Sequence, residues 1–205
     1  MNRDSLPIAG VLIALALFGL AAWLYPGGYD WAHHFISMMF APTTATGAVN
    51  KARPVAILAM FVLCFSQAVL FKRLAGRATR RVHRKTLEIG GIGSMVYGFL
   101  VVTPLHDLLV GIALLFFVAA MLAALHWMWV EGRPTLVGTG LVSLVLLAVT
   151  AVMYYGHVLW NLLPIAQKAS FLACFGWLMA LQIATSKGHR EDAGGTHAQR
   201  VARRV

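Results

Sequence analysis

Long apolar stretches dominate this sequence and limit the kind of fold that it can adopt. Six of them approach the ~20 residues that an α-helix needs to cross the hydrocarbon core of a bilayer. They cover residues 7–25, 54–71, 87–104, 107–130, 136–156 and 164–185. With 60% hydrophobic and only 12% charged residues, the chain has too few polar groups to solvate this much apolar surface in water. The sequence therefore predicts an all-α, polytopic membrane protein built as a bundle of six transmembrane helices.

The basic residues are distributed unequally between the two ends of these runs. Only Lys51, Arg53 and Lys168 lie at one side, and the other fourteen of the seventeen Lys and Arg residues lie at the opposite side. Because basic loops stay in the cytoplasm, we expect both termini to be cytoplasmic in a plasma (inner) membrane protein. Residues 186–205 are polar and predict a disordered, basic cytoplasmic tail.

The net charge of +10 would point to nucleic acid in a soluble protein. Here the orientation of the helices and contact with anionic lipid account for it, so we expect membrane lipids and not nucleic acid as partners. Lys168, at the start of the last run, is expected to extend toward the lipid headgroups.

A polar segment, residues 29–50, connects the first two runs on the outer side of the membrane. Helical spacing over residues 30–37 predicts a short amphipathic helix that lies flat on the membrane with its polar face toward the protein. That face would carry four side chains: Asp30, His33, His34 and Ser37.

Further polar side chains gather near the outer ends of the runs. His106 and Asp107 open the fourth run, and Tyr154, His157 and Asn161 would share a helical face at the end of the fifth. Each has an ordinary explanation alone, such as helix capping or an interfacial position. Because polar groups are costly beside lipid, their clustering favours one outer pocket. The predicted pocket also contains Ser37, Asn50 and Gln167.

The outer histidines are compatible with three functions. In the first, a pocket binds or processes a lipid headgroup, and zinc bound by His34, His106 and His157 activates water for hydrolysis. In the second, His106 and His157 bind haem b for electron transfer. In the third, the protein is a non-catalytic structural or partner subunit, in a homo-oligomer or a larger membrane complex. The candidate catalytic side chains of the first function are Asp30, His33, His34 and Asp107.

On the inner side, two features are expected to serve packing. Gly90, Ser94 and Gly98 recur at every fourth position of the third run, which allows close approach of neighbouring helices. His126 lies beside Trp127 and is expected to pack in the interfacial aromatic belt, whereas His83 is expected in a basic loop.

Short motifs occur in the outer loop and at two later places in the chain: His34-Phe35-Ile36-Ser37 with Gly47 and Asn50, Pro104-x-x-Asp107, and Gln167-Lys168. In these motifs the chain resembles the DUF998 membrane proteins, which are similar in layout to the Frag1/DRAM-like six-helix proteins. Where that family tends to continue with Asp-Leu-Gly after the serine, this chain has Met38-Met39-Phe40. The resemblance implies six helices and an outer-face loop, and it implies no established reaction.

Overall fold

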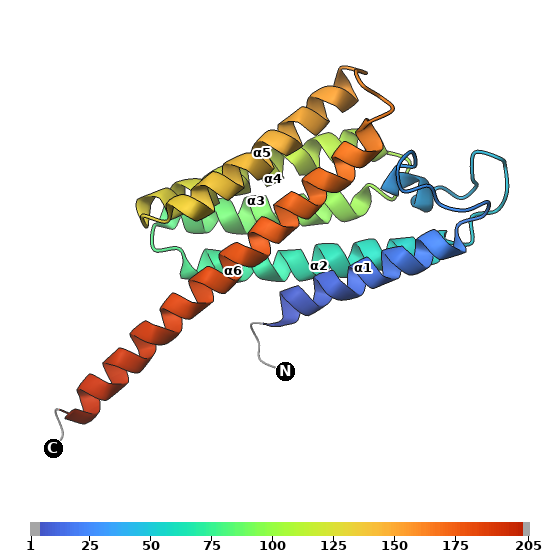
Figure 1. Cartoon of the computed structure of the whole chain (residues 1–205). Helices are drawn as coiled ribbons and strands as arrows, with labels where there is room; N and C mark the ends of the chain where they lie inside the picture. Colours follow the sequence, from blue (N-terminus) through green and yellow to red (C-terminus); the bar gives the residue numbers. More distant parts are fainter. Residues whose placement is uncertain (1–4, 203–205) are drawn as a thin grey trace.

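The computed structural model describes the backbone of residues 5–202 and the side chains of residues 5–186. Within these residues the regular structure is helical, and the one β-type contact is an isolated bridge between Thr43 and Val49. The prediction of an all-α, six-helix bundle is confirmed (Figure 1). The elements are α1 (Leu6–Leu24), η2 (Ile36–Phe40), α2 (Arg53–Arg77), α3 (Arg81–Leu100), α4 (His106–Val130), α5 (Pro134–Tyr155) and α6 (Leu163–Ala202).

Among the described residues, five helices are long and apolar enough to cross a membrane, namely α1, α2, α4, α5 and the Leu163–Ser186 part of α6. The remaining long helix, α3, begins six residues before the predicted run because its first turns carry charged residues, Arg81, Arg84 and Lys85. These residues continue the helix beyond its apolar part, which starts at Leu87.

The backbone of α6 continues as a helix to Ala202, beyond the predicted end of the last run at residue 185. The predicted tail, residues 186–205, falls almost entirely outside the described side chains, so its disorder stays a prediction.

Consecutive helices pack side by side, and α6 also touches α2 (Figure 1). Because the helices alternate in direction, α1 begins and α6 ends at one end of the bundle. The opposite end carries η2 and the connections from α3 to α4 and from α5 to α6. We call this second end the loop end.

The small residues of α3 allow the close approach predicted from the sequence. A Cβ atom built on Gly91 would lie 2.1 Å from the ring of Phe71 in α2. A Cβ atom on Gly90 would lie 3.0 Å from the backbone oxygen of Phe116 in α4. The two adjacent glycines therefore let α3 pack tightly against α2 on one side and α4 on the other.

Residues 30–37 do not form the predicted amphipathic helix. They form a turn followed by the 3₁₀-helix Ile36–Phe40. The Asp30 carboxylate accepts hydrogen bonds from the backbone N–H groups of Ala32 and His33, at 2.8 and 3.2 Å. A short side chain that bonds to its own backbone in this way competes with helix formation. The prediction of a single polar helical face in this segment is therefore wrong.

Candidate functional site

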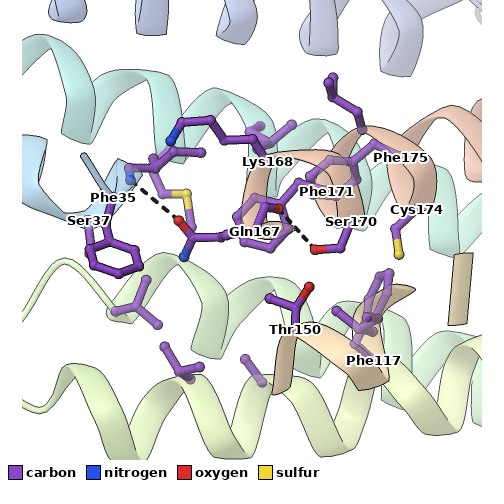
Figure 2. A pocket seen from close by; sticks show the side chains of 18 of the residues that line it. Phe35, Ser37, Phe117, Thr150, Gln167, Lys168, Ser170, Phe171, Cys174 and Phe175 are labelled. Atoms are coloured by element: carbon purple, nitrogen blue, oxygen red, sulfur yellow. Dashed lines mark hydrogen bonds between the residues drawn. The ribbon is translucent and has the colours of Figure 1, made fainter. Parts of the chain in front are cut away.

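A cavity of about 480 Å³ lies between the helices and is lined by residues of all six long helices and of the outer segment, residues 29–50. This volume falls within the range of small-molecule binding sites. The lining is mainly apolar and includes the labelled side chains Phe117, Phe171 and Phe175 (Figure 2). No Asp or Glu is among the described residues that line it.

The polar lining residues are concentrated toward the loop end. Lys168 lies in the second turn of α6, and Met179, which also lines the cavity, lies eleven residues further along that helix. At a rise of about 1.5 Å per residue, the lining therefore extends roughly 16 Å along α6 from its polar to its apolar end. Five polar residues form the polar end: Ser37, His106, Tyr154, Gln167 and Lys168.

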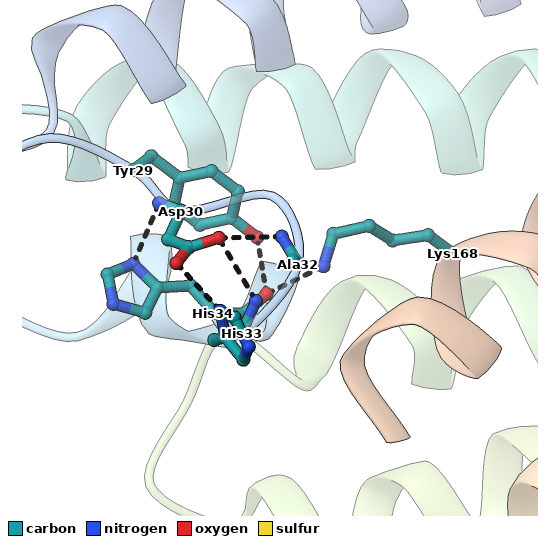
Figure 3. Close-up of polar contacts among 6 residues, drawn as sticks. All are labelled: Tyr29, Asp30, Ala32, His33, His34 and Lys168. Carbon is teal, nitrogen blue, oxygen red and sulfur yellow. Dashed lines mark hydrogen bonds and ion pairs between the residues drawn. The ribbon is translucent and has the colours of Figure 1, made fainter. Parts of the chain in front are cut away.

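Lys168 and Gln167 attach the outer segment to α6. The Lys168 ammonium donates hydrogen bonds to the backbone oxygens of His34 (2.6 Å) and Pro164 (3.1 Å) and lies 5.7 Å from the centre of the Tyr29 ring (Figure 3). The Gln167 Oε1 atom accepts a hydrogen bond from the Ile36 N–H at 3.4 Å (Figure 2). The sequence position of Lys168 predicts that its side chain extends toward the lipid headgroups. In the structure its ammonium instead binds backbone oxygens of the protein.

His34 is held by aromatic rings and the local backbone. Its ring lies 5.7 Å from that of Tyr25 and 5.5 Å from that of Tyr29. Its Nδ1 accepts a hydrogen bond from the Asp30 N–H at 3.2 Å, so the neutral ring carries its proton on Nε2. The Tyr29 hydroxyl donates to the His34 backbone oxygen at 2.9 Å, and burial raises the pKa of Tyr29 (Figure 3).

Asp30 and His33 form an exposed pair beside this cluster. The His33 Nδ1 lies 2.8 Å from the Asp30 Oδ2. The hydrogen bond from the His33 side chain, helped by the N–H of Ala32, lowers the pKa of Asp30 to about 2. Neither Asp30 nor His33 lines the cavity, so this pair orders the turn and does not contribute to the polar end.

The structure brings together three of the predicted site residues where α4 and α5 meet. The His106 Nδ1 lies 3.0 Å from the Asp107 Oδ1, and the Tyr154 hydroxyl donates to the same oxygen at 2.5 Å. His106 and Tyr154 line the cavity, whereas Asp107 is exposed. The Asp107 carboxylate thus orients the side chains of both His106 and Tyr154. A carboxylate in this position also determines which ring nitrogen of a neutral histidine carries the proton.

His157 and Asn161 do not share a helical face, because α5 ends at Tyr155 and His157 has a positive φ of 52°. Both side chains are exposed, and His157 stacks on Trp160 with ring centres 5.4 Å apart. The prediction that they line one wall of the pocket through helical spacing is therefore wrong.

Asn50 is buried and has a structural role. Its side-chain amide donates to three backbone oxygens between Met38 and Ala41, at 2.9–3.3 Å, and its Oδ1 accepts from the Ala52 N–H at 3.1 Å. It joins the end of η2 to the start of α2 and is not one of the lining residues.

Among residues 5–186, no three or more His, Cys, Asp or Glu side chains are arranged to hold a metal ion. His34 contacts two tyrosines, His106 contacts Asp107, and His157 contacts Trp160. The structure therefore does not gather these three histidines into the predicted zinc site. Haem binding by His106 and His157 stays a prediction.

One histidine pair in the structure was not predicted from the sequence. The His83 Nε2 lies 2.8 Å from the His126 Nδ1, at the end of the bundle opposite the loop end. We had expected α3 to begin at residue 87, which left His83 in a loop. The signal was the spacing of His83, Leu87 and Gly90, which places His83 on the inward face of a longer helix.

Comparison of the chain with protein-family models, with curated proteins and with solved structures found no match, so the resemblance to DUF998 proteins stays a prediction.

Proposed function

We propose that this protein binds a lipid-like amphiphile in the interhelical cavity, with the headgroup at the polar end and the hydrocarbon chain along α6. The observation that carries the proposal is the division of one cavity into an end lined by Lys168, Gln167 and His106 and a remainder lined mainly by aromatic and aliphatic side chains. An elongated cavity that is polar at one end matches a molecule that is polar at one end.

The polar end favours a headgroup with an anionic oxygen. Lys168 is the one Lys or Arg among the described lining residues, and no lining carboxylate neutralises it. Two of its three N–H donors bind backbone oxygens, which leaves a third for a ligand. The side chains of Ser37, Gln167 and Tyr154 add neutral hydrogen-bonding groups around it.

Processing of the headgroup is a second candidate function, and the contact between His106 and Asp107 favours it. A histidine that faces the cavity and is oriented by a carboxylate has the arrangement of a general base. In this function His106 would accept a proton from the headgroup or from water, and Asp107 would be a positioning residue.

The distribution of basic residues supports an orientation with both termini in the cytoplasm and the cavity's polar end on the outer side of a plasma membrane. The headgroup of the ligand would then belong to the outer leaflet.

A cavity-filling variant tests the proposal. Ala151 lines the cavity from α5, whereas Ala148, one turn earlier, is exposed and does not line it. The full-length protein is purified in mild detergent, its bound lipids are extracted, and these are identified and counted by mass spectrometry. Ala151→Phe is expected to lose the retained amphiphile, and Ala148→Phe is expected to keep it.

Equal retention by the two alanine variants, or no retained amphiphile in the unsubstituted protein, would contradict lipid binding in this cavity. A His106→Gln variant separates the two functions. If the headgroup is processed, the unsubstituted protein is expected to convert its ligand and His106→Gln is expected to leave it unconverted. If the protein only binds, neither protein is expected to convert the ligand.

A further inference from the structure

A groove of about 520 Å³ lies at the end of the bundle opposite the loop end, between the first turns of α3 and the last turns of α4. It is separate from the interhelical cavity and shares no lining residue with it. Its polar lining consists of Arg80, Arg81, His83, Thr86 and His126. The lining contains no acidic side chain among the described residues.

The buried member of the histidine pair has an unsatisfied nitrogen. His83 is only 4% exposed, and its Nδ1 has no hydrogen-bond partner within the described part of the chain. Its Nε2 lies 2.8 Å from the His126 Nδ1, so one of these two nitrogens carries the shared proton. When His126 donates, the proton of neutral His83 lies on Nδ1 and requires an acceptor. In this tautomer a ligand oxygen at Nδ1 would remove the cost of a buried donor without an acceptor.

The surrounding charges favour an anion as that ligand. Arg80 and Arg81 contribute two guanidinium groups, which match phosphate oxygens in shape and charge. Arg80 is also the N-cap residue of α3 and makes no side-chain cap, so its side chain does not satisfy the N–H groups in the first turn of this 20-residue helix. The nearest acidic residue along α3, Glu88, is paired with Lys72 of α2.

The opposite wall of the groove is apolar. Ala119, Leu122 and Ala123 of α4 line it, and Leu122 is 51% exposed. A cationic rim above an exposed apolar wall is the arrangement that accepts a phosphate attached to a hydrocarbon chain.

We infer that this groove is a phosphate-binding site, which takes a phosphate group as the headgroup of an anionic lipid or as a free anion. Arg80, Arg81 and the α3 N-terminus would bind the phosphate oxygens, and His83, held by His126, would complete the site from within the bundle. The inference does not depend on the function proposed for the interhelical cavity.

Two double variants with equal loss of charge test the inference. Arg80→Ala/Arg81→Ala removes two groove residues, whereas Arg84→Ala/Lys85→Ala removes two cations of the same helix that do not line the groove. The full-length proteins are placed in phosphatidylcholine nanodiscs that contain increasing phosphatidylglycerol, and native mass spectrometry counts the anionic lipids retained. The groove variant is expected to bind phosphatidylglycerol about tenfold more weakly than the matched control.

Competition by inorganic phosphate separates the two sources of the phosphate group. If inorganic phosphate displaces phosphatidylglycerol, the groove is a site for the free anion. If phosphatidylglycerol stays bound in the presence of inorganic phosphate, the groove is a lipid site. Ala119→Phe, which fills the groove without a change in charge, is expected to weaken binding in both cases. Equal affinities of the two double variants would overturn the inference, because binding would then reflect charge alone. So would undiminished binding by Ala119→Phe.

Discussion

The ammonium of Lys168 donates a hydrogen bond to the backbone oxygen of His34, 134 residues earlier in the chain, at 2.6 Å. This contact joins the outer segment to the start of α6, next to the polar end of the cavity. The Gln167 contact with Ile36 lies beside it, so two adjacent side chains of α6 hold the segment in place.

Lys168→Met is expected to release the outer segment from α6. The substitution keeps most of the aliphatic stem and removes a charged donor. A hydrogen bond in which one partner is charged contributes about 1.5–3 kcal/mol to stability. Hydrogen–deuterium exchange of residues 29–40 is expected to become about tenfold faster. Lys51→Met, at an exposed position of the same loop, is the control and is expected to leave exchange unchanged. Unaltered protection in Lys168→Met would show that other contacts suffice.

Asn50→Ala is expected to destabilise the junction of η2 and α2. The substitution leaves backbone oxygens between Met38 and Ala41 without their donor, and buried unsatisfied groups cost about 1–3 kcal/mol. Asn50→Asp is expected to be worse, since it directs carboxylate oxygens at the same acceptors. Thermal unfolding in detergent measures both, with the exposed Asn161→Ala as the control. An Asp variant as stable as the Ala variant would argue against this hydrogen-bond geometry.

Gly91→Ala is expected to disrupt the contact between α3 and α2. The added Cβ would lie 2.1 Å from the Phe71 ring, and overpacking of a tight core costs about 1–3 kcal/mol or more. Gly138→Ala in α5 provides the matched control, because a Cβ there meets no atom within 4 Å. It is expected to be neutral or slightly stabilising, since Ala favours helix over Gly. Comparable stability of the two variants in a denaturant titration is the result that would refute this packing.

The Asp30 turn is expected to persist at acidic pH. Its pKa of about 2 lies below the ordinary value of 3.8, so the contribution of the charged carboxylate to stability is complete above pH 3.8. It declines as the pH falls from 3.8 and is lost below about 2. The carboxyl ¹³C chemical shift of Asp30 measures this titration directly. His33→Ala removes the largest cause of the low pKa and is expected to move the midpoint upward, and an unchanged midpoint would contradict the pairing.

The sequence predicted the bundle well because apolar length is a direct measure of what a bilayer requires. Both ends of α1, α4 and α5 lie within about two residues of their predicted positions. The start of α3 was missed because charged residues such as Arg81 and Lys85 can continue a helix after it leaves the apolar region. The end of an apolar run shows where a helix leaves the lipid, but the helix itself can continue further.

The candidate site was predicted less well, because its contacts depend on the rotation of helices about their axes. The contact between Asp107 and Tyr154 joins α4 to α5, and no spacing within either helix reveals it. The predicted polar face at 30–37 failed because Asp30 bonds to the local backbone. The predicted alignment of His157 with Asn161 failed because α5 stops two residues before His157.

The adjacent glycines of α3 also determine how this helix can rotate. Since successive residues project about 100° apart, turning α3 by a single position would bring Ile92 to the place of Gly91 and press its branched side chain into the Phe71 ring. A turn in the other sense would bring Ile89 toward the Phe116 carbonyl in place of Gly90. The two glycines therefore fix the rotation of α3 about its own axis between α2 and α4.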